Sequence, residues 1–302
     1  MRIAITGSTG LIGRHLTRAL LERGDSVIAF SRPSSNAVNV PIIRWDPELN
    51  FMNAADLTAV GQLDAVVHLA GAGVADRRWT SRRKALILES RTRSTELLAA
   101  RLGDLASPPQ ILLSSSAIGY YGSCGAKVLT EQSPTGSGFL AEVCQAWEGA
   151  TSSLRGSDIV VTTARTGIVL TADGGALGKQ LPLFKAGLGG QVGSGEQFVS
   201  SISLDDQIRA MLFLLEHPTP GPVNLVGPDP VTNKQFTHEL ATLLHRPALF
   251  RVPRVALAAA LGAELCDEAL LASQRVRPEV LLQAGFDFRH PTNALALAAA
   301  LA

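Results

Sequence analysis

The segment Gly7-Ser8-Thr9-Gly10-Leu11-Ile12-Gly13 decides the fold. It follows Arg2–Thr6, a predicted strand, and opens the helical pattern Leu11–Arg23. Gly7 would permit the tight turn, Gly10 would let the backbone approach a pyrophosphate, and Gly13 would let the helix pack closely on the strand. Free N–H groups and the helix dipole then favour an anion. The sequence therefore predicts a dinucleotide-binding loop, with contacts from Gly7, Thr9, Gly10, Leu11, Ile12 and Gly13.

Beyond this loop, short β-rich runs alternate with longer helical patterns. This alternation predicts an α/β fold of the Rossmann type, with a doubly wound parallel sheet. The predicted strands are Arg2–Thr6, Ser26–Phe30, Ile42–Trp45, Asp64–Leu69, Gln110–Ser115, Ile159–Ala164 and, late in the chain, Val223–Val226. The predicted helices are Leu11–Arg23, Ser81–Leu102, Phe139–Leu154, Asp205–Glu216 and Asn233–Leu244.

The pattern changes after the sixth strand. The segment Thr166–Ser201 holds eight glycines from Gly174 to Gly195, which favours loops and short pieces with a binding role. We expect a dinucleotide-binding domain formed by residues 1–165 and 203–226. Residues 166–202 and 227–302 would form a smaller, mostly helical lobe, with the substrate cleft between the two.

Composition narrows the classes of partner. The 302 residues are 46% hydrophobic, and the formal net charge is +1, which argues against a nucleic-acid-binding protein. Three cysteines without a metal-binding spacing are typical of reduced thiols, so we expect a cytoplasmic protein. The apolar stretches are too short for a membrane span. We expect a small-molecule substrate, no membrane or nucleic-acid partner and no metal, and the oligomeric state stays open.

The end of the second strand bears on the choice of cofactor. It reads Ala29-Phe30-Ser31-Arg32, where an NAD enzyme usually places an acid to hold the ribose 2′-hydroxyl. Arg32 would attract a 2′-phosphate, and Ser31 adds a hydroxyl donor. An alternative is that Arg32 is only a solvated surface residue. The absence of an acid at this strand end favours NADP(H) in either case.

Further motifs resemble the short-chain dehydrogenase/reductase superfamily in its extended, epimerase-like form. The matching residues are His68-Leu69-Ala70-Gly71, Ser114-Ser115-Ser116 and Tyr121-Gly122. The chain is most similar to an atypical branch called epimerase family proteins, through the phrases GYYG (119–122), FLAEVCQAWE (139–148), GGALGK (174–179), GLGGQVGSGEQF (187–198) and NKQFTHEL (233–240). The resemblance implies that Asp46 lies near the adenine, and that the ribose and nicotinamide are lined by Leu69, Ala70, Gly71, Arg91, Ser114 and Val169.

The superfamily's acid–base pair is missing. Its chemistry uses a tyrosine and, four residues later, a lysine that lowers the pKa of the tyrosine. Alignment of the helix through Trp147-Glu148 puts Leu140 and Cys144 at these two positions. Leucine carries no exchangeable proton, and cysteine supplies no fixed positive charge. Ser116 fits the position of the serine that orients the reacting oxygen.

Substitutes for the missing pair follow the fifth strand. We select Ser116 and Tyr121 as candidate catalytic residues, because the loop carrying Tyr121 opens at the same strand end as Ser116. Without a nearby cation, Tyr121 would act as a neutral acid in carbonyl reduction. Glu142 is a weaker candidate. His68, at the end of a buried strand, is expected to be a packed, hydrogen-bonded histidine.

The substrate end also departs from sugar-nucleotide epimerases. By resemblance, an arginine that holds the diphosphate should stand where this chain has Val199, and a buried diphosphate without its cation is costly. Ser201 and Ser203 replace an expected tryptophan and histidine. The sequence thus favours an NADP-dependent oxidoreductase or epimerase acting on an unidentified small molecule. The alternative is a non-enzymatic NADP(H)-binding sensor or partner-binding protein.

Overall fold

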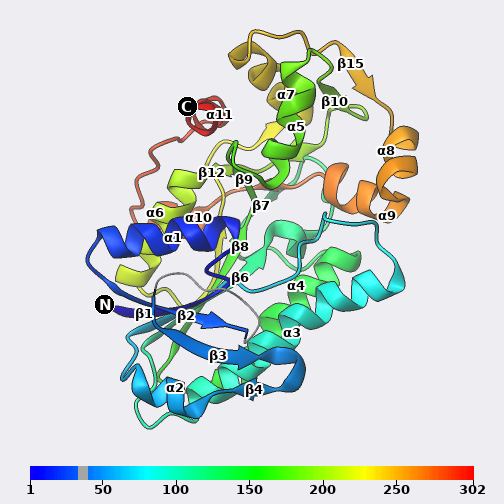
Figure 1. The fold of residues 1–302 in the computed structure, drawn as a ribbon. Coiled ribbons are helices and arrows are strands. Elements are labelled where there is room, and N and C mark those ends of the chain that lie inside the picture. The colour runs from blue at the N-terminus through cyan, green and yellow to red at the C-terminus, as the bar shows by residue number, and fades with distance from the viewer. Residues whose placement is uncertain (33–39) are drawn as a thin grey trace.

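The computed structural model describes residues 1–32 and 40–302, and its centre is one twisted sheet (Figure 1). The strand order is β13-β8-β6-β5-β1-β2-β3-β4. The strands are parallel except β4, which pairs antiparallel with β3. The chain runs outward from β1 through β2 and β3, then returns to β5 on the other side of β1. Their bounds are β1 (Arg2–Thr6), β2 (Ser26–Ser31), β3 (Ile42–Asp46), β4 (Phe51–Met52), β5 (Ala65–His68), β6 (Ile111–Ala117), β8 (Val160–Thr166) and β13 (Gly221–Leu225).

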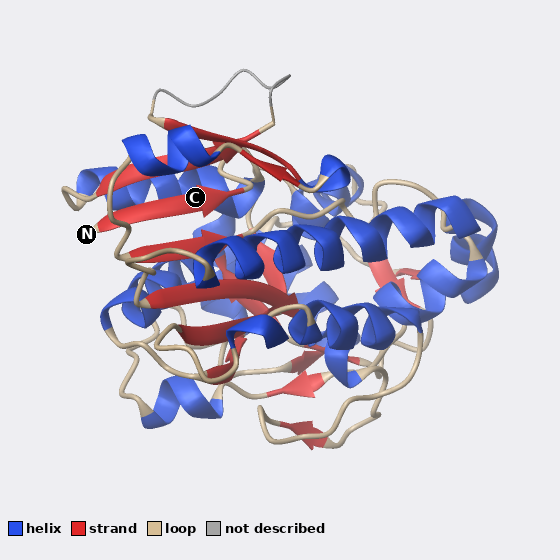
Figure 2. Cartoon of the chain, turned by 90° about the horizontal axis from the view of Figure 1, so that it is seen from below, coloured by secondary structure: helices blue, strands red, loops and turns tan. Residues whose placement is uncertain are grey.

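Helices cover both faces of the sheet (Figure 2). Side chains alternate along a strand, so Ile3 and Ile5 pack toward one layer while Ala4 packs toward the other. The first layer consists of α1 (Leu11–Glu22), α6 (Leu204–Glu216) and α10 (Glu279–Gln283). The second contains α2 (Ala54–Ala59) and α3 (Ser81–Gly103), with α4 (Phe139–Gly149) beside α3. Burial on both faces explains why the strands are nearly all apolar.

A separate apolar cluster holds together the part of the chain drawn above the sheet in Figure 1. It is formed by α5 (Gly175–Lys185), α7 (Asn233–Leu243) and α11 (Asn293–Leu301). Short strand pairs surround it, namely β9 (Ile168–Leu170) with β12 (Ser201–Ser203), β10 (Gly190–Val192) with β15 (Phe250–Val252), and β11 (Phe198–Val199) with β14 (Val231–Thr232). The chain also forms β7 (Val128–Leu129), which pairs with β16 (Arg275–Val276), and the helices α8 (Arg254–Leu261) and α9 (Ala263–Leu265). The described residues also form four short helical turns, η1 (Pro47–Leu49), η2 (Ile118–Tyr121), η3 (Ser152–Leu154) and η4 (Cys266–Leu270).

All seven predicted strands and all five predicted helices are present, with ends shifted by a few residues at most except at α4, which stops at Gly149. One expectation is wrong, because the glycine-rich segment contains the 11-residue helix α5. Its two glycines lie within its first four residues, while Leu177, Leu181 and Phe184 recur at helical spacing and are buried. Among the described residues, no helix combines the length and the apolarity that a membrane span requires.

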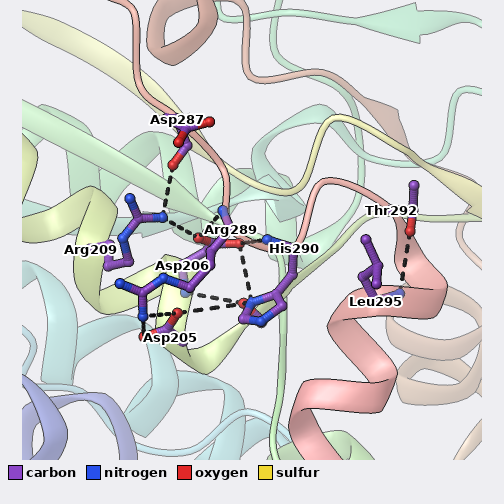
Figure 3. A network of polar contacts seen from close by, with 9 residues as sticks. Asp205, Asp206, Arg209, Asp287, Arg289, His290, Thr292 and Leu295 are labelled. Carbon is purple, nitrogen blue, oxygen red and sulfur yellow. Dashed lines mark hydrogen bonds and ion pairs between the residues drawn. The ribbon is translucent and has the colours of Figure 1, made fainter.

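A buried carboxylate docks the C-terminal segment onto α6 (Figure 3). Asp206 is fully buried, and its two oxygens accept the backbone N–H groups of Arg289 at 2.9 Å and His290 at 2.8 Å. Arg209 adds a charged contact at 2.9 Å, and Arg289 reaches Asp205 at 3.1 Å. Asp205, Asp206 and His290 could together face a cation. Since these groups already have cationic or N–H partners, we attribute the network to docking of the segment.

Replacing Asp206 should therefore destabilise the fold. Asp206→Ala would leave two partly buried N–H groups without their acceptor, each at a cost of about 1–2 kcal/mol because water reaches them in part, so urea titration should show a loss of roughly 2–4 kcal/mol in the free energy of unfolding. Asp205→Ala removes an exposed ion pair and should cost less than about 1 kcal/mol. Equal losses in the two variants would contradict this account.

Candidate functional site

The phosphate loop has the geometry that its glycines predict. Gly7 has φ +67°, and Gly10 precedes α1 without any side-chain cap for the first turn. A Cβ atom on Gly13 would lie 2.1 Å from the carbonyl oxygen of Gly7, so only glycine lets α1 pack here. No acid lies in the first turn of α1. Its uncapped N–H groups, including those of Leu11 and Ile12, therefore form a positive helix end suited to a phosphate.

A cavity of about 520 Å³ lies beside this loop. It sits at the carboxyl ends of β1, β2, β3 and β5, where the strand order reverses, the usual ligand position in such sheets. Nine of the fifteen predicted cofactor residues line it, namely Gly7, Thr9, Gly10, Ser31, Arg32, Asp46, Leu69, Ala70 and Gly71. Trp45 lines it as well. The structure thus brings residues from four strand ends to one place.

The other six predicted residues are not among those that line the cavity. Leu11, Ile12 and Gly13 form the start of α1. Leu11 and the carbonyl oxygen of Val169 both lie within 4 Å of where a Cβ atom on Gly175 would stand. Ser114 is buried in β6, 2% exposed. Arg91 lies behind the cavity edge, where its guanidinium donates to the carbonyls of Ala72 and Ile87 at 3.0 Å.

The charge of the cavity is more mixed than the sequence predicts. No acid ends β2, but the tertiary structure brings Asp46 and Glu48, which follow β3, to the same cavity as Arg32. Asp46 accepts the backbone N–H of Glu48 at 3.0 Å and so caps η1. The acid-free end of β2 therefore does not describe the whole cavity, because the fold brings in two acids that follow β3.

His68 holds one wall of the cavity, and its predicted packed and hydrogen-bonded state is confirmed. Thr6 Oγ1 accepts the N–H groups of Leu69 and Ala70 at 2.9 and 3.1 Å, so its proton goes to His68 Nδ1 at 2.7 Å. His68 Nε2 then donates to Thr95 Oγ1 at 2.9 Å. Burial lowers the pKa of His68 to about 3, with a smaller effect from Arg91. A neutral histidine of fixed tautomer thus orients Thr6, which holds the backbone of Leu69 and Ala70 at the cavity wall.

Ser116 belongs to a buried ionic network rather than to the wall of this cavity. Its hydroxyl donates to Glu148 Oε1 at 2.7 Å, and Arg165 binds the same carboxylate through two nitrogens, each at 2.8 Å. Arg165 is 3% exposed. Burial alone would lower the pKa of Arg165, but the paired carboxylate raises it above its ordinary value. Since its proton points to Glu148, Ser116 presents an oxygen that can accept a hydrogen bond from a ligand.

Tyr121 lies in the same network, and one premise about it is wrong. We expected no cation near Tyr121, yet Arg165 donates to the Tyr121 hydroxyl at 3.0 Å. That hydroxyl in turn donates to Asn224 Oδ1 at 2.7 Å. The side chain has no exposed surface, and burial raises the pKa of the phenol. The long separation in sequence between Tyr121 and Arg165 hid the contact.

The structure also shows what fills the positions of the missing tyrosine and lysine. Leu140 and Cys144 both face Gly119, where a Cβ atom would lie 3.3 Å from Leu140 Cβ and 3.6 Å from Cys144 Sγ. Cys144 is 3% exposed, and burial together with Glu148 raises the pKa of its thiol to about 11. It is therefore neutral at pH 7 and provides no cation for proton transfer.

Two further residues extend the network to the C-terminal segment and were missed by sequence reasoning. Asn224 donates to the carbonyl of Arg277 at 3.0 Å, while its own N–H donates to Glu131 Oε1 at 3.0 Å. Glu131 also accepts the N–H of Val280 at 3.3 Å, and burial raises its pKa. No periodicity or motif signals these contacts, which join segments about 50 to 150 residues apart.

Comparison with known proteins now assigns the family. Residues 3–226 match the model of the NAD dependent epimerase/dehydratase family. The chain belongs to the NAD-dependent epimerase/dehydratase family. Residues 252–300, which include α8 to α11, match a second model that is described as a domain of unknown function. The resemblance inferred from the glycine loop and the later motifs is thus confirmed, as is the Rossmann-type fold.

Relatives of this epimerase/dehydratase family member cover nearly its whole length. An epimerase family protein of Mycobacterium bovis is 43% identical over 296 residues, covering 98% of this chain and 96% of the relative. A chloroplastic epimerase family protein of Arabidopsis thaliana is 34% identical, over 96% and 84%. The crystal structure of human epimerase family protein SDR39U1 with NADPH superposes with a TM-score of 0.89 at 31% identity, over 99% and 98%.

The neutral state of His68 should appear in the pH dependence of stability. Between the unfolded pKa of 6.5 and the native pKa of about 3, only the unfolded chain binds this proton, so acid lowers the free energy of unfolding. In this window His68 should add a slope approaching 1.4 kcal/mol per pH unit, which His68→Gln should remove. Urea titrations from pH 7 to 4 measure both slopes, and parallel curves would refute the assignment.

Proposed function

We propose that the chain binds NADP(H) in the cavity beside the phosphate loop. The observation that carries this proposal is the uncapped start of α1, with Gly7 in a left-handed turn and Arg32 lining the same cavity. The backbone would hold the pyrophosphate, and Ser31 and Arg32 would hold the 2′-phosphate. That the human relative was solved with NADPH supports this choice of cofactor.

The function we infer is that of an NADP-dependent oxidoreductase or epimerase acting on a small molecule. The bound cofactor would supply hydride transfer. Ser116 would hold the substrate oxygen, since its own proton is directed to Glu148 and its oxygen can accept from a substrate hydroxyl. The absence of the tyrosine–lysine pair favours slow chemistry. Tyr121, enclosed and bonded to Arg165 and Asn224, fits a positioning role better than that of proton donor.

A second candidate function is a non-enzymatic NADP(H)-binding sensor or partner-binding protein. It is favoured by Leu140 and Cys144, which leave the standard acid–base positions with an aliphatic side chain and a buried neutral thiol. For the cellular location we propose the cytoplasm, because the three cysteines are free thiols, typical of a reducing compartment.

Cofactor preference tests the proposed binding mode. Calorimetry on the wild-type protein should show tighter binding of NADP(H) than of NAD(H). Arg32→Ala should remove about 1.5–3 kcal/mol from NADP(H) binding, or about tenfold to a hundredfold in affinity, and should leave NAD(H) binding nearly unchanged. Glu48→Gln is the matched opposite, since it removes a negative charge from the same cavity and should tighten NADP(H) binding. An unchanged preference in Arg32→Ala would exclude the proposed 2′-phosphate contact.

Turnover separates the two candidate functions. Oxidation of bound NADPH should be followed while pools of carbonyl metabolites are offered. An enzyme should show turnover that falls about tenfold or more in Ser116→Ala, because the substrate oxygen loses its partner, while NADPH binding stays the same. Gln145→Ala, at an exposed position of α4, serves as control. Turnover insensitive to Ser116 would contradict its role, and no turnover with any pool would favour the sensor.

A further inference from the structure

A dense run of basic side chains follows the cavity wall at the carboxyl end of β5. Residues 77–84 read RRWTSRRK, with five cations among eight positions. The net charge of +1 for the whole chain hides this run, because acids elsewhere balance it. It begins five residues after Ala72, which lines the cavity, and it includes the start of α3. A basic segment therefore continues directly from the proposed cofactor site.

Arg83 is the member of this run that faces the cavity side of α3. Leu86, Ser90 and Ser94 line the cavity and lie 3, 7 and 11 residues after Arg83, a spacing that places them along one helix face. The Arg83 guanidinium also donates to the carbonyl of Gly73, one residue beyond the cavity wall. Arg83 therefore extends the row of cavity-lining side chains toward the C-terminal lobe.

One hydrogen-bond donor of the Arg83 guanidinium has no acceptor. Its side chain is 15% exposed, and its Nε atom is buried with no hydrogen-bond partner. The nearest acid is Asp76, at 3.6 Å from another nitrogen of the same guanidinium. A buried donor without an acceptor costs free energy, and an anionic oxygen is the acceptor that would relieve it best.

The acids near this run are too few to neutralise it. Asp76 is shared between Arg83 and Lys179 of α5, the latter at 3.7 Å. Glu264 of α9 pairs with Lys84 at 2.5 Å. Arg78 donates instead to the carbonyls that end α8, at 3.0 and 3.4 Å. These contacts link the segment to α5, α8 and α9, and they leave more cations than acids among the side chains involved.

We propose that this run, with Arg83 at its centre, binds an anionic oxygen group of the substrate, a phosphate or a carboxylate. The inference rests on the proposed function and adds the substrate class to it. It also explains how the chain can take an anionic substrate although Val199 stands where related epimerases hold a diphosphate with arginine. The cations would come instead from the segment after β5.

Calorimetry on the full chain saturated with NADPH tests the proposal, because the cofactor then occupies the phosphate loop. Inorganic phosphate, malonate and, as a neutral probe, glycerol are titrated separately. We expect phosphate or malonate to bind, glycerol to give no heat of binding, and Arg83→Gln to weaken the anion about tenfold. Arg93→Gln is the matched control, since Arg93 lies exposed on α3 and pairs with Glu89. Which anion binds more tightly identifies the group.

Two further measurements keep the outcome decisive. Arg83→Gln also loses the contact to Gly73, so Arg77→Gln combined with Arg82→Gln, both at exposed positions, provides a second variant that should weaken the anion a few-fold. NADPH affinity is measured first in every protein. If NADPH fails to bind the wild type, the proposed function is overturned. If NADPH binds but neither anion does, or the anion binds Arg83→Gln as tightly as it binds Arg93→Gln, the present inference is overturned.

Discussion

The fold depends on the close approach of two glycines in the first turn after β1. A single Cβ atom at Gly13 would stand 2.1 Å from the Gly7 carbonyl, so any side chain there would push α1 away from the sheet. With glycine at both positions, α1 packs on β1 and leaves its first N–H groups without a cap. The same close packing therefore lets α1 cover the sheet and places its positive N-terminal end where a phosphate can bind.

Buried polar networks then fix the walls around that helix end. Thr6, His68 and Thr95 form a chain of neutral hydrogen bonds that holds the backbone at Leu69 and Ala70. Arg165 and Glu148 form a buried ion pair. Ser116 donates a hydrogen bond to Glu148, and Arg165 donates one to Tyr121. Because breaking a buried pair leaves an uncompensated charge, such networks tolerate few arrangements and make the site rigid.

In a rigid site, residues that depart from the superfamily pattern leave no free space for other groups to take over their positions. Leu140 and Cys144 pack against the Gly119 turn, so the space of the missing acid–base pair is filled by protein. Ser201 and Ser203 replace larger residues expected by resemblance. Ser201 donates to Asn293 and Ser203 contacts His290 Nδ1, so both help to dock the C-terminal segment. In the function proposed here, Ser116 holds the substrate oxygen, and the basic segment after β5 supplies the positive charge.

The sequence by itself determined the Rossmann-type fold, the position of the phosphate loop and the bounds of nearly every main element. These follow from local patterns, since turn geometry, helical spacing and strand alternation depend on neighbouring residues. The resemblance to the superfamily also located Leu140 and Cys144 at the positions of the missing acid–base pair. Only the tertiary structure decided that Glu48 joins Arg32 at one cavity, that Arg165 lies against Tyr121, and that Arg83 has a buried donor without an acceptor. Such contacts join residues distant in the chain, and no local pattern encodes which charges the packed elements bring together.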